Sequence, residues 1–202
     1  MTEAFWEGMY QARERVWSGR PNRFLVDVVE PLAPGTALDL GCAEGADAVW
    51  LAGLGWKVTA VDVSPTALRR AEAAAEGLGI AFEQHDLGET FPQGTYDLVS
   101  AQFLQSPVEF PRERVLRQAA AAVAPGGLLL IVEHASAPPW SGMGGDVRLP
   151  TAAETLAALE LADGEWVVER ADSPEREVTG PDDRTATISD NVIAARRVNS
   201  QP

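Results

Sequence analysis

The sequence has little positive charge, and almost none of it comes from lysine. Lys57 is the only lysine among 16 basic residues, against 30 acidic residues, which gives a net charge of −14. Nucleic acids and anionic membrane surfaces are bound by clusters of Lys and Arg. The charge balance therefore predicts no nucleic-acid partner and no membrane partner, and it favours a small-molecule substrate or a neutral or basic partner.

Cysteine, histidine and long apolar runs are also scarce. Cys42 is the only cysteine, so neither an intrachain disulfide nor a cysteine-based zinc site can form. His85 and His134 are too far apart in the sequence for a metal motif, and we predict no metal site. No stretch approaches ~18 consecutive apolar residues, and Glu3 and Glu7 interrupt the first ten, so we expect neither a membrane helix nor a signal peptide. We expect a cytoplasmic protein.

What the sequence does contain is a regular alternation of strand and helix patterns. Short apolar or β-branched runs stand at 36–40, 57–61, 80–85, 96–101 and 128–132. Helical patterns cover much of the first thirty residues, and also 45–54, 65–76, 112–124 and 151–159. This alternation predicts the α/β class, with a Rossmann-like, doubly wound, mostly parallel sheet of seven strands.

The C-terminal part of the pattern differs from the rest. Two further strands are predicted at 165–171 and 186–195, with no helix between them. A hairpin is therefore expected there, with one antiparallel strand near the C-terminus. The charged segment 172–184 contains two prolines and is predicted to be a surface loop.

The length predicts one domain over 1–202. Within it we expect three parts: a helical lid segment at 1–31, a ligand-binding core at 36–133, and a substrate-side loop with the closing strands at 135–202.

The strongest chemical signal is the turn that follows the first core strand. It runs from Ala37 to Gly45 and contains Asp39, Gly41 and Ala43. Ligands of this fold class bind at the carboxyl ends of the strands, where glycine lets the backbone approach them closely. Asp39 would repel a pyrophosphate but could hold a cation. The turn therefore predicts a nucleoside-like ligand that carries positive charge.

Two other nucleotide motifs do not fit this turn. The dinucleotide fingerprint needs glycines at 41, 43 and 46, but the chain has Ala43 and Ala46. No lysine follows the glycines, which excludes a phosphate-binding P-loop.

Two more acids stand at the ends of the next two strands. Asp62 ends the second strand and could accept hydrogen bonds from both hydroxyls of a ribose. Asp86 ends the third strand and is followed by Leu87. A carboxylate there could accept from an exocyclic amine, while the Leu87 N–H donates to a ring nitrogen. Together the three acids match a cation, a ribose and an adenine.

These residues resemble the class I S-adenosylmethionine-dependent methyltransferases. The shared pattern is an acid and three small residues in the first turn (39, 41, 43 and 45), acids after the second and third strands, and Pro125-Gly126-Gly127 before the fifth. It covers about 36–133 and departs from the family at Ala43, where glycine is usual. The segment 17–22 and the first turn are also similar to the small tellurite-resistance and thiopurine methyltransferases.

The resemblance implies S-adenosylmethionine as cofactor, S-adenosylhomocysteine as product, and a set of cofactor-binding residues. These are Trp17, Asn22, Asp39, Gly41, Cys42, Ala43, Gly45, Asp62, Val63, Asp86, Leu87, Ala101 and Gln102. Cys42 would contribute its backbone rather than its thiol. The Ala101 carbonyl would accept from the methionine ammonium, and Gln102 either orients the substrate or faces solvent.

His134, at the end of the fifth strand, is the candidate catalytic residue. A histidine at the ligand-side edge of the sheet can act as a general base near neutral pH. The alternative is a histidine that only forms a hydrogen bond within a loop. Trp140 and Met143, in the loop that follows, could form an apolar substrate wall.

The predicted reaction is methyl transfer to a small-molecule heteroatom (S, Se, N or O) by in-line displacement. The donor is already activated, so the protein would supply alignment and desolvation. Two alternatives stay open: a non-catalytic S-adenosylmethionine-binding protein, and a nicotinamide-dependent oxidoreductase, which Ala43 and Ala46 disfavour. The sequence predicts neither the acceptor nor the oligomeric state.

Overall fold

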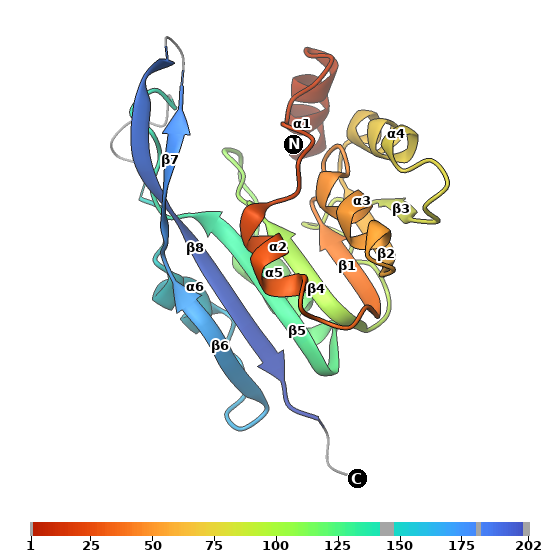
Figure 1. The fold of residues 1–202 in the computed structure, drawn as a ribbon, viewed down its shortest axis with the longest axis vertical. Helices are drawn as coiled ribbons and strands as arrows, with labels where there is room; N and C mark the ends of the chain where they lie inside the picture. The colour runs from red at the N-terminus through yellow and green to blue at the C-terminus, as the bar shows by residue number, and fades with distance from the viewer. Residues whose placement is uncertain (1, 142–147, 181–182, 200–202) are drawn as a thin grey trace.

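The structure, a computed structural model, describes residues 2–141, 148–180 and 183–199 (Figure 1). Its helices are α1 (Thr2–Gln11), α2 (Arg23–Val29), α3 (Ala46–Gly53), α4 (Pro65–Ala74), α5 (Arg112–Ala121) and α6 (Ala152–Ala158). Its strands are β1 (Thr36–Leu40), β2 (Lys57–Asp62), β3 (Ala81–Gln84), β4 (Tyr96–Gln102), β5 (Val123–His134), β6 (Trp166–Asp172), β7 (Glu175–Thr179) and β8 (Thr185–Arg197).

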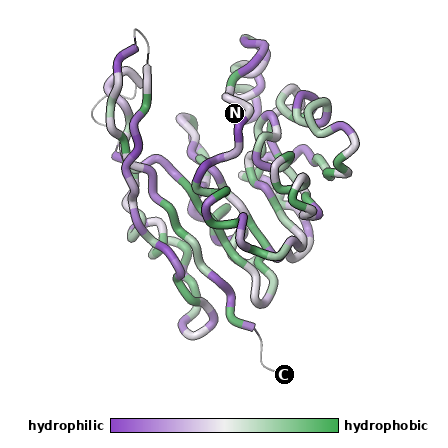
Figure 2. The backbone as a smooth tube through the Cα atoms, viewed as in Figure 1, coloured by the Kyte–Doolittle hydropathy of each residue, from purple (hydrophilic) through white to green (hydrophobic). Residues whose placement is uncertain are grey.

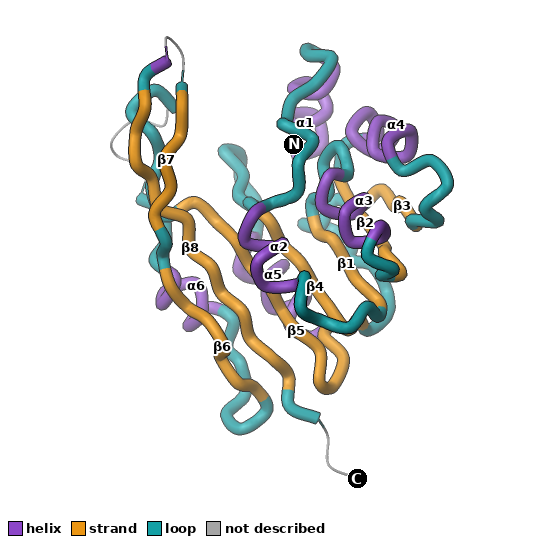
Figure 3. The backbone as a smooth tube through the Cα atoms, viewed as in Figure 1, coloured by secondary structure: helices purple, strands orange, loops and turns teal. Residues whose placement is uncertain are grey.

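All of these strands join one sheet, whose order is β3-β2-β1-β4-β5-β8-β6, with β7 paired to β8 (Figure 3). The ladders among β1 to β5 are parallel, and β8 runs antiparallel to β5, β6 and β7. The predicted doubly wound, mostly parallel sheet is therefore confirmed, and so is its single antiparallel strand near the C-terminus. The sheet has eight strands within the described residues, not the seven predicted.

The extra strand is β7, which lies inside the segment predicted to be a loop. The prediction for 172–184 was wrong at Glu175–Thr179, where alternate residues are half-buried against β8. β8 is 13 residues long, and its first half pairs with β7. Charged residues in a two-stranded arm give little hydrophobic signal, because only one side of such an arm is covered.

The core has two layers, one on each face of the sheet. Leu128, Leu130 and Val132 of β5 pack with α2 and α3, whereas Leu129 and Ile131 pack with α5 and α6. Figure 2 shows the hydrophobic residues concentrated along these central strands. The uninterrupted apolar run at 128–132 is thus buried on both faces, as expected for a central parallel strand.

The topology creates one edge at which ligands of this fold class bind. The chain builds β1, β2 and β3 outward in one direction and then returns to place β4 and β5 on the other side of β1. The carboxyl ends of β1 and β4 thus meet at the point where the strand order reverses. Helix α1 lies beyond this same edge, at the top of Figure 1. Within the described ranges, no helix has the length and apolar character needed to cross a membrane.

Candidate functional site

The turn after β1 is held in an unusual backbone conformation. Gly41, Ala43 and Gly45 all have positive φ, at 71°, 52° and 84°. The N–H groups of Gly41 and Cys42 both donate to the Val61 carbonyl of β2, at 2.8 and 2.9 Å. A left-handed conformation costs a residue with a Cβ roughly 1–2 kcal/mol, so Ala43 is strained where glycine would not be. The strain is kept at a turn that faces the ligand edge.

Gly45 also sets the distance between two helices. It precedes the first residue of α3, and a Cβ at this position would lie 2.8 Å from the Ala71 Cβ of α4. A side chain here would push the two helices apart. The absence of a Cβ therefore brings α3 and α4 together beside the turn.

Asp39, the last residue but one of β1, is a buried acid without a hydrogen-bond partner at Oδ2 within the described part of the chain. Burial raises its pKa well above the usual range, and repulsion from Asp47 and Asp62 raises it further. An isolated buried carboxylate is costly unless positive charge approaches it. The structure thus leaves an unpaired carboxyl group where the sequence predicted a bound cation.

Asp47, in the first turn of α3, is the second acid of this group. Burial raises its pKa to about 6, although the Asn22 N–H donates to Oδ1 at 2.7 Å and opposes the shift. Asp47 was not predicted from the sequence. Its position two residues after Gly45 was the available signal.

Asp62 ends β2 and ties the first turn to the second. Its Oδ2 accepts from the Ala43 N–H and its Oδ1 from the Ser64 N–H, both at 2.9 Å. Burial raises the pKa of Asp62 despite these bonds. Each carboxylate oxygen retains a second acceptor site, so the group can still receive the two hydroxyls of a ribose.

The unpaired buried atoms gather among the predicted binding residues. Five buried side-chain polar atoms within the described residues have no partner, and three of them belong to Asn22, Asp39 and Gln102. Unpaired buried groups are rare in folded proteins and call for an explanation. Here a ligand with a cationic group and several polar atoms would satisfy them, so the residues present fit the predicted cofactor.

The remaining predicted contacts have mixed surroundings. Asp86 Oδ1 accepts from the Gly88 N–H at 3.0 Å, which closes a turn, and Leu87 is buried in the core on the α5 side. The Val63 carbonyl accepts from Gln84 Nε2 at 3.1 Å. The Ala101 side chain is fully buried beside the half-buried Gln102 at the end of β4.

Cys42 and the two predicted N-terminal residues have structural partners of their own. Burial raises the pKa of the Cys42 thiol, which favours the thiol over the nucleophilic thiolate. Asn22 Oδ1 caps α2 by accepting from the Phe24 N–H at 2.9 Å. Trp17 is 49% exposed, and its indole N–H donates to the Tyr10 hydroxyl at 2.9 Å.

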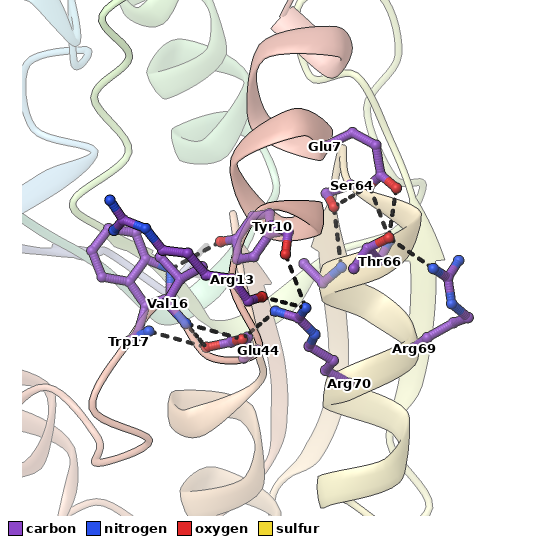
Figure 4. Close-up of polar contacts among 11 residues, drawn as sticks. Glu7, Tyr10, Arg13, Val16, Trp17, Glu44, Ser64, Thr66, Arg69 and Arg70 are labelled. Atoms are coloured by element: carbon purple, nitrogen blue, oxygen red, sulfur yellow. Dashed lines mark hydrogen bonds and ion pairs between the residues drawn. The ribbon is translucent and has the colours of Figure 1, made fainter.

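Residues 2–22, which we call the N-terminal strap, are fastened over this edge. Glu7 of α1 accepts from the Ser64 and Thr66 hydroxyls, each at 2.5 Å, and from the Thr66 N–H at 3.1 Å (Figure 4). Its partial burial acts to raise its pKa, but these bonds outweigh it and lower the pKa to about 2. The strap is thus anchored at the start of α4, two residues beyond Asp62.

A second anchor joins the strap to the first turn. Glu44 accepts from the N–H groups of Val16 and Trp17, with the closer contacts at 3.2 and 3.1 Å, and from Arg70 Nη1 at 2.9 Å. Arg70 Nη2 donates to the carbonyls of Tyr10 and Arg13 at 2.9 and 2.7 Å. Figure 4 shows both anchors side by side.

His134 lies at the same edge, and its ring has two partners within the described residues. Nδ1 is 3.0 Å from Asp190 Oδ1 of β8, and the ring stacks on Phe103 with the centroids 4.2 Å apart. The backbone N–H of His134 donates to Gln105 Oε1 at 2.8 Å. Burial acts to raise the pKa of Asp190, but hydrogen bonds from His134 and Arg176 outweigh it and lower the pKa.

Glu133, the residue before His134, forms a buried cluster on the opposite face. Its Oε1 accepts from the Thr155 hydroxyl at 2.6 Å and from Asn191 Nδ2 at 2.8 Å, and its Oε2 pairs with Arg112. The cluster joins α5, α6, β5 and β8.

Several residues of this edge were not predicted from the sequence: Glu7, Glu44, Asp47, Arg70, Phe103 and Asp190. Glu44 lies inside the predicted turn, but no nearby sequence feature indicated its partners, which are 26 to 28 residues away. The Arg184 guanidinium carbon lies over the Trp140 ring, 5.6 Å from the ring centroid. Met143, the other predicted wall residue, lies outside the described residues. No group of three or more His, Cys, Asp or Glu side chains in the described ranges could hold a metal ion.

The profile of a protein family described as a methyltransferase domain matches residues 10–170. The 2-heptyl-1-hydroxyquinolin-4(1H)-one methyltransferase of Mycobacteroides abscessus is 30% identical over 163 residues, covering 76% of this chain and 69% of that protein. The ribosomal RNA small subunit methyltransferase C of Chromohalobacter salexigens is 33% identical over 108 residues, which cover 50% of this chain. The chain spans only 32% of the length of that relative.

Solved structures share the whole fold. One described for the conversion of a disulfide bond into a thioacetal group during echinomycin biosynthesis has a TM-score of 0.74 and 28% identity, covering 100% of this chain and 94% of its own. TehB from Haemophilus influenzae has a TM-score of 0.69 and 19% identity, covering 97% of this chain and 67% of its own. With a family match over most of its length, the chain belongs to the methyltransferase domain family, within class I of the S-adenosylmethionine-dependent methyltransferases.

Proposed function

We propose that this chain binds S-adenosylmethionine at the carboxyl edge of the sheet and catalyses methyl transfer to a heteroatom (S, Se, N or O) of a small molecule. One observation carries the proposal: three of the five buried polar atoms without partners in the described residues belong to predicted binding residues, including the acid Asp39. A ligand with positive charge at this edge would relieve the repulsion among Asp39, Asp47 and Asp62.

Each part of the cofactor has a proposed partner. The backbone of 41–45 and the acid Asp39 would surround the methionine end, together with the Ala101 carbonyl and Gln102. Asp62 would accept from the ribose hydroxyls, with Val63 alongside. Asp86 and the Leu87 N–H would contact the adenine.

The sulfonium supplies an activated methyl group, so the protein's own task is to align the two reactants and exclude water. We propose the strap for the second role, as the lid part of the segment 1–31, with Trp17 and Asn22 on its cofactor side. Support comes from its anchors: Glu7 bonds to Ser64, two residues beyond Asp62, and the Glu44–Arg70 pair joins it to the first turn. The core at 36–133 would hold the cofactor, and 135–202 would line the acceptor site.

The acceptor that we propose is a small molecule. The net charge of −14 disfavours an RNA substrate, because RNA binding requires clustered positive charge. A relative that aligns over 76% of this chain is named for a hydroxyquinolinone, whereas the relative named for ribosomal RNA aligns over half of it.

Calorimetry tests the cofactor site. The wild-type protein should bind S-adenosylmethionine and S-adenosylhomocysteine but not NAD⁺, which separates the proposal from a nicotinamide enzyme. Asp62→Ala should weaken binding by about 1–3 kcal/mol, the usual loss when hydrogen bonds to a charged group are removed. Asp97→Asn is the matched control, because Asp97 lies at the opposite end of the strands, on Thr36.

Two outcomes would overturn the proposal. No binding at millimolar cofactor would exclude the site, and unchanged affinity in Asp62→Ala would exclude the ribose contact. Binding without release of S-adenosylhomocysteine in the presence of thiols, phenols and amines would favour the non-catalytic alternative.

A further inference from the structure

We propose that His134 and Asp190 form a catalytic pair in which His134 Nε2 removes the proton of a neutral hydroxyl on an aromatic acceptor, while Asp190 positions the imidazole. The inference rests on the proposed function and names the acceptor class of the same site.

The geometry fixes which ring nitrogen is free for chemistry. His134 and Asp190 are directly opposite each other in the β5–β8 ladder, and Nδ1 lies 3.0 Å from Asp190 Oδ1. An ionised carboxylate only accepts hydrogen bonds, so Nδ1 carries the proton and Nε2 becomes the acceptor. The His134 side chain is 32% exposed while that of Asp190 is fully buried, so the ring can meet a ligand and the carboxylate cannot.

The ring is also held against rotation and displacement. It stacks on Phe103, which immediately follows Gln102 of β4, at an interplanar angle of 27°. The His134 backbone exchanges hydrogen bonds with the Gln105 amide, at 2.8 and 3.3 Å. A base with a fixed orientation loses little freedom in the transition state.

The place of this pair in the sheet puts it at the edge where we propose that the methyl donor binds. β4 and β5 are neighbours, and Gln102 pairs with Val132, two residues before His134. Gln102 Oε1 is one of the unpaired buried atoms at the proposed cofactor edge. His134 therefore lies at the edge where an acceptor would have to bind to reach a methyl group held over the end of β4.

The charges around the pair keep Asp190 ionised. Arg176 of β7 donates from Nε to Asp190 Oδ2 and from Nη2, at 3.5 Å, to Oδ1, which is also the partner of His134 Nδ1. Glu133 and Arg112 form a separate ion pair on the opposite face of β5. An anionic, immobile Asp190 stabilises the imidazolium that forms when His134 takes up a proton.

The proposed step balances without any further reactant. As the acceptor oxygen forms a bond to the methyl carbon, the S–C bond breaks and its electron pair stays on sulfur. The hydroxyl proton moves to His134 Nε2 and is then released to water. A thiolate or selenide is already ionised near neutral pH and gains nothing from a base, so the pair favours a hydroxyl, whose phenolic pKa is about 10.

The test compares variants on acceptors that do and do not need a base. The probes are a phenol, an N-hydroxyquinolinone and a thiophenol, with S-adenosylhomocysteine release as the readout. His134→Gln should lower kcat for the hydroxylated probes about 10²–10³-fold, remove the acidic limb of the pH–rate profile, and leave the thiophenol rate nearly unchanged. Asp190→Asn should lower the same kcat about tenfold or more, and His85→Gln, on Glu83 and Thr90, is the matched control.

Calorimetry and NMR keep each outcome decisive. If His134→Gln binds S-adenosylmethionine normally but loses hydroxyl methylation, both proposals stand. If it binds normally and methylates phenol at the wild-type rate, the catalytic pair is wrong and the cofactor site stands. Failure of the wild-type protein to methylate any hydroxylated probe overturns the acceptor class. Nitrogen-15 NMR should show the Nδ1–H tautomer of His134 in the wild-type protein, and this preference should disappear in Asp190→Asn. An Nε2–H tautomer in the wild-type protein would overturn the pair, even if Asp190→Asn does not fold.

Discussion

Glu133 and His134 are neighbours on β5, yet they stand in opposite kinds of environment. Glu133 is fully buried, and both of its oxygens have partners from α5, α6 and β8. His134 points to the other face, where a partner is fixed at Nδ1 and the ring stays one-third exposed. The same contrast extends to Asp39, whose Oδ2 is buried without a partner in the described residues. The hydrogen-bonded oxygens of Glu133 stabilise the fold, whereas an unpaired buried atom such as Asp39 Oδ2 calls for an explanation.

The largest effect is expected from opening the satisfied cluster. Glu133→Ala should lower the free energy of unfolding by about 3–5 kcal/mol, because Arg112 then lacks its buried partner, as do Thr155 and Asn191. Urea unfolding measures the loss. Glu169→Ala, which breaks the exposed pair with Arg196, is the control and should cost less than about 1 kcal/mol. Equal losses in the two variants would remove the contrast.

Ionisation of Asp47, in the group of buried acids with Asp39 and Asp62, should destabilise the fold, whereas the ionised Glu133 stabilises it. Burial raises the pKa of Asp47 to about 6 in the folded protein. Between about pH 4 and pH 6, the Asp47 carboxyl is therefore protonated in the folded protein but ionised in the unfolded chain. Without cofactor, the free energy of unfolding should therefore fall as the pH rises through this range, by about 1–3 kcal/mol for this group.

Asp47→Asn should flatten that part of the profile and weaken cofactor binding at neutral pH. Urea unfolding at several pH values, followed by calorimetry, measures both. Asp97→Asn is the comparison, because hydrogen bonds from Thr36 lower the pKa of that acid and removing them should cost stability. A variant less stable than the wild type at neutral pH would show that Asp47 belongs with Glu133 instead.

The strap gives the smallest effect, because its anchors are partly exposed. Arg70→Met removes three hydrogen bonds that hold Tyr10, Arg13 and Glu44, so the amides of Val16 and Trp17 should exchange about tenfold faster, equivalent to about 1.4 kcal/mol of local opening. The global unfolding temperature should hardly change. Arg69→Met, whose guanidinium donates to Thr66 of its own helix, should leave both amides as in the wild type. Accelerated exchange in both variants would point to damage to α4 itself.

The parts predicted correctly are those encoded over short distances. The apolar run at 128–132 predicted a strand, which is covered on both faces. The helical pattern that starts at 65 predicted α4, whose first turn is capped by the Ser64 hydroxyl, which accepts from the Ala67 N–H. The turn around Ala43 was also predicted, down to the position where glycine is usual, which the structure explains by a φ of 52°.

The parts that were missed depend on partners far away in the sequence. Asp190 is 56 residues from His134, and Glu7 is 57 residues from Ser64. Strand β7 was missed because its charged residues gain their order only from pairing with β8. Local spacing carries no information on such pairs, since register and burial bring them together only after the sheet has formed.

The sequence alone therefore determined the α/β alternation, the turn after β1 and the acids at three strand ends, because each depends on the order of neighbouring residues. The tertiary structure decided which polar groups are satisfied: Glu133 by three partners across the core, Asp190 by His134 and Arg176, and Glu44 by the strap. Burial is a property of the assembled chain. Only the tertiary structure therefore shows that Asp39 Oδ2 has no partner among the described residues and that the His134 ring stays partly exposed.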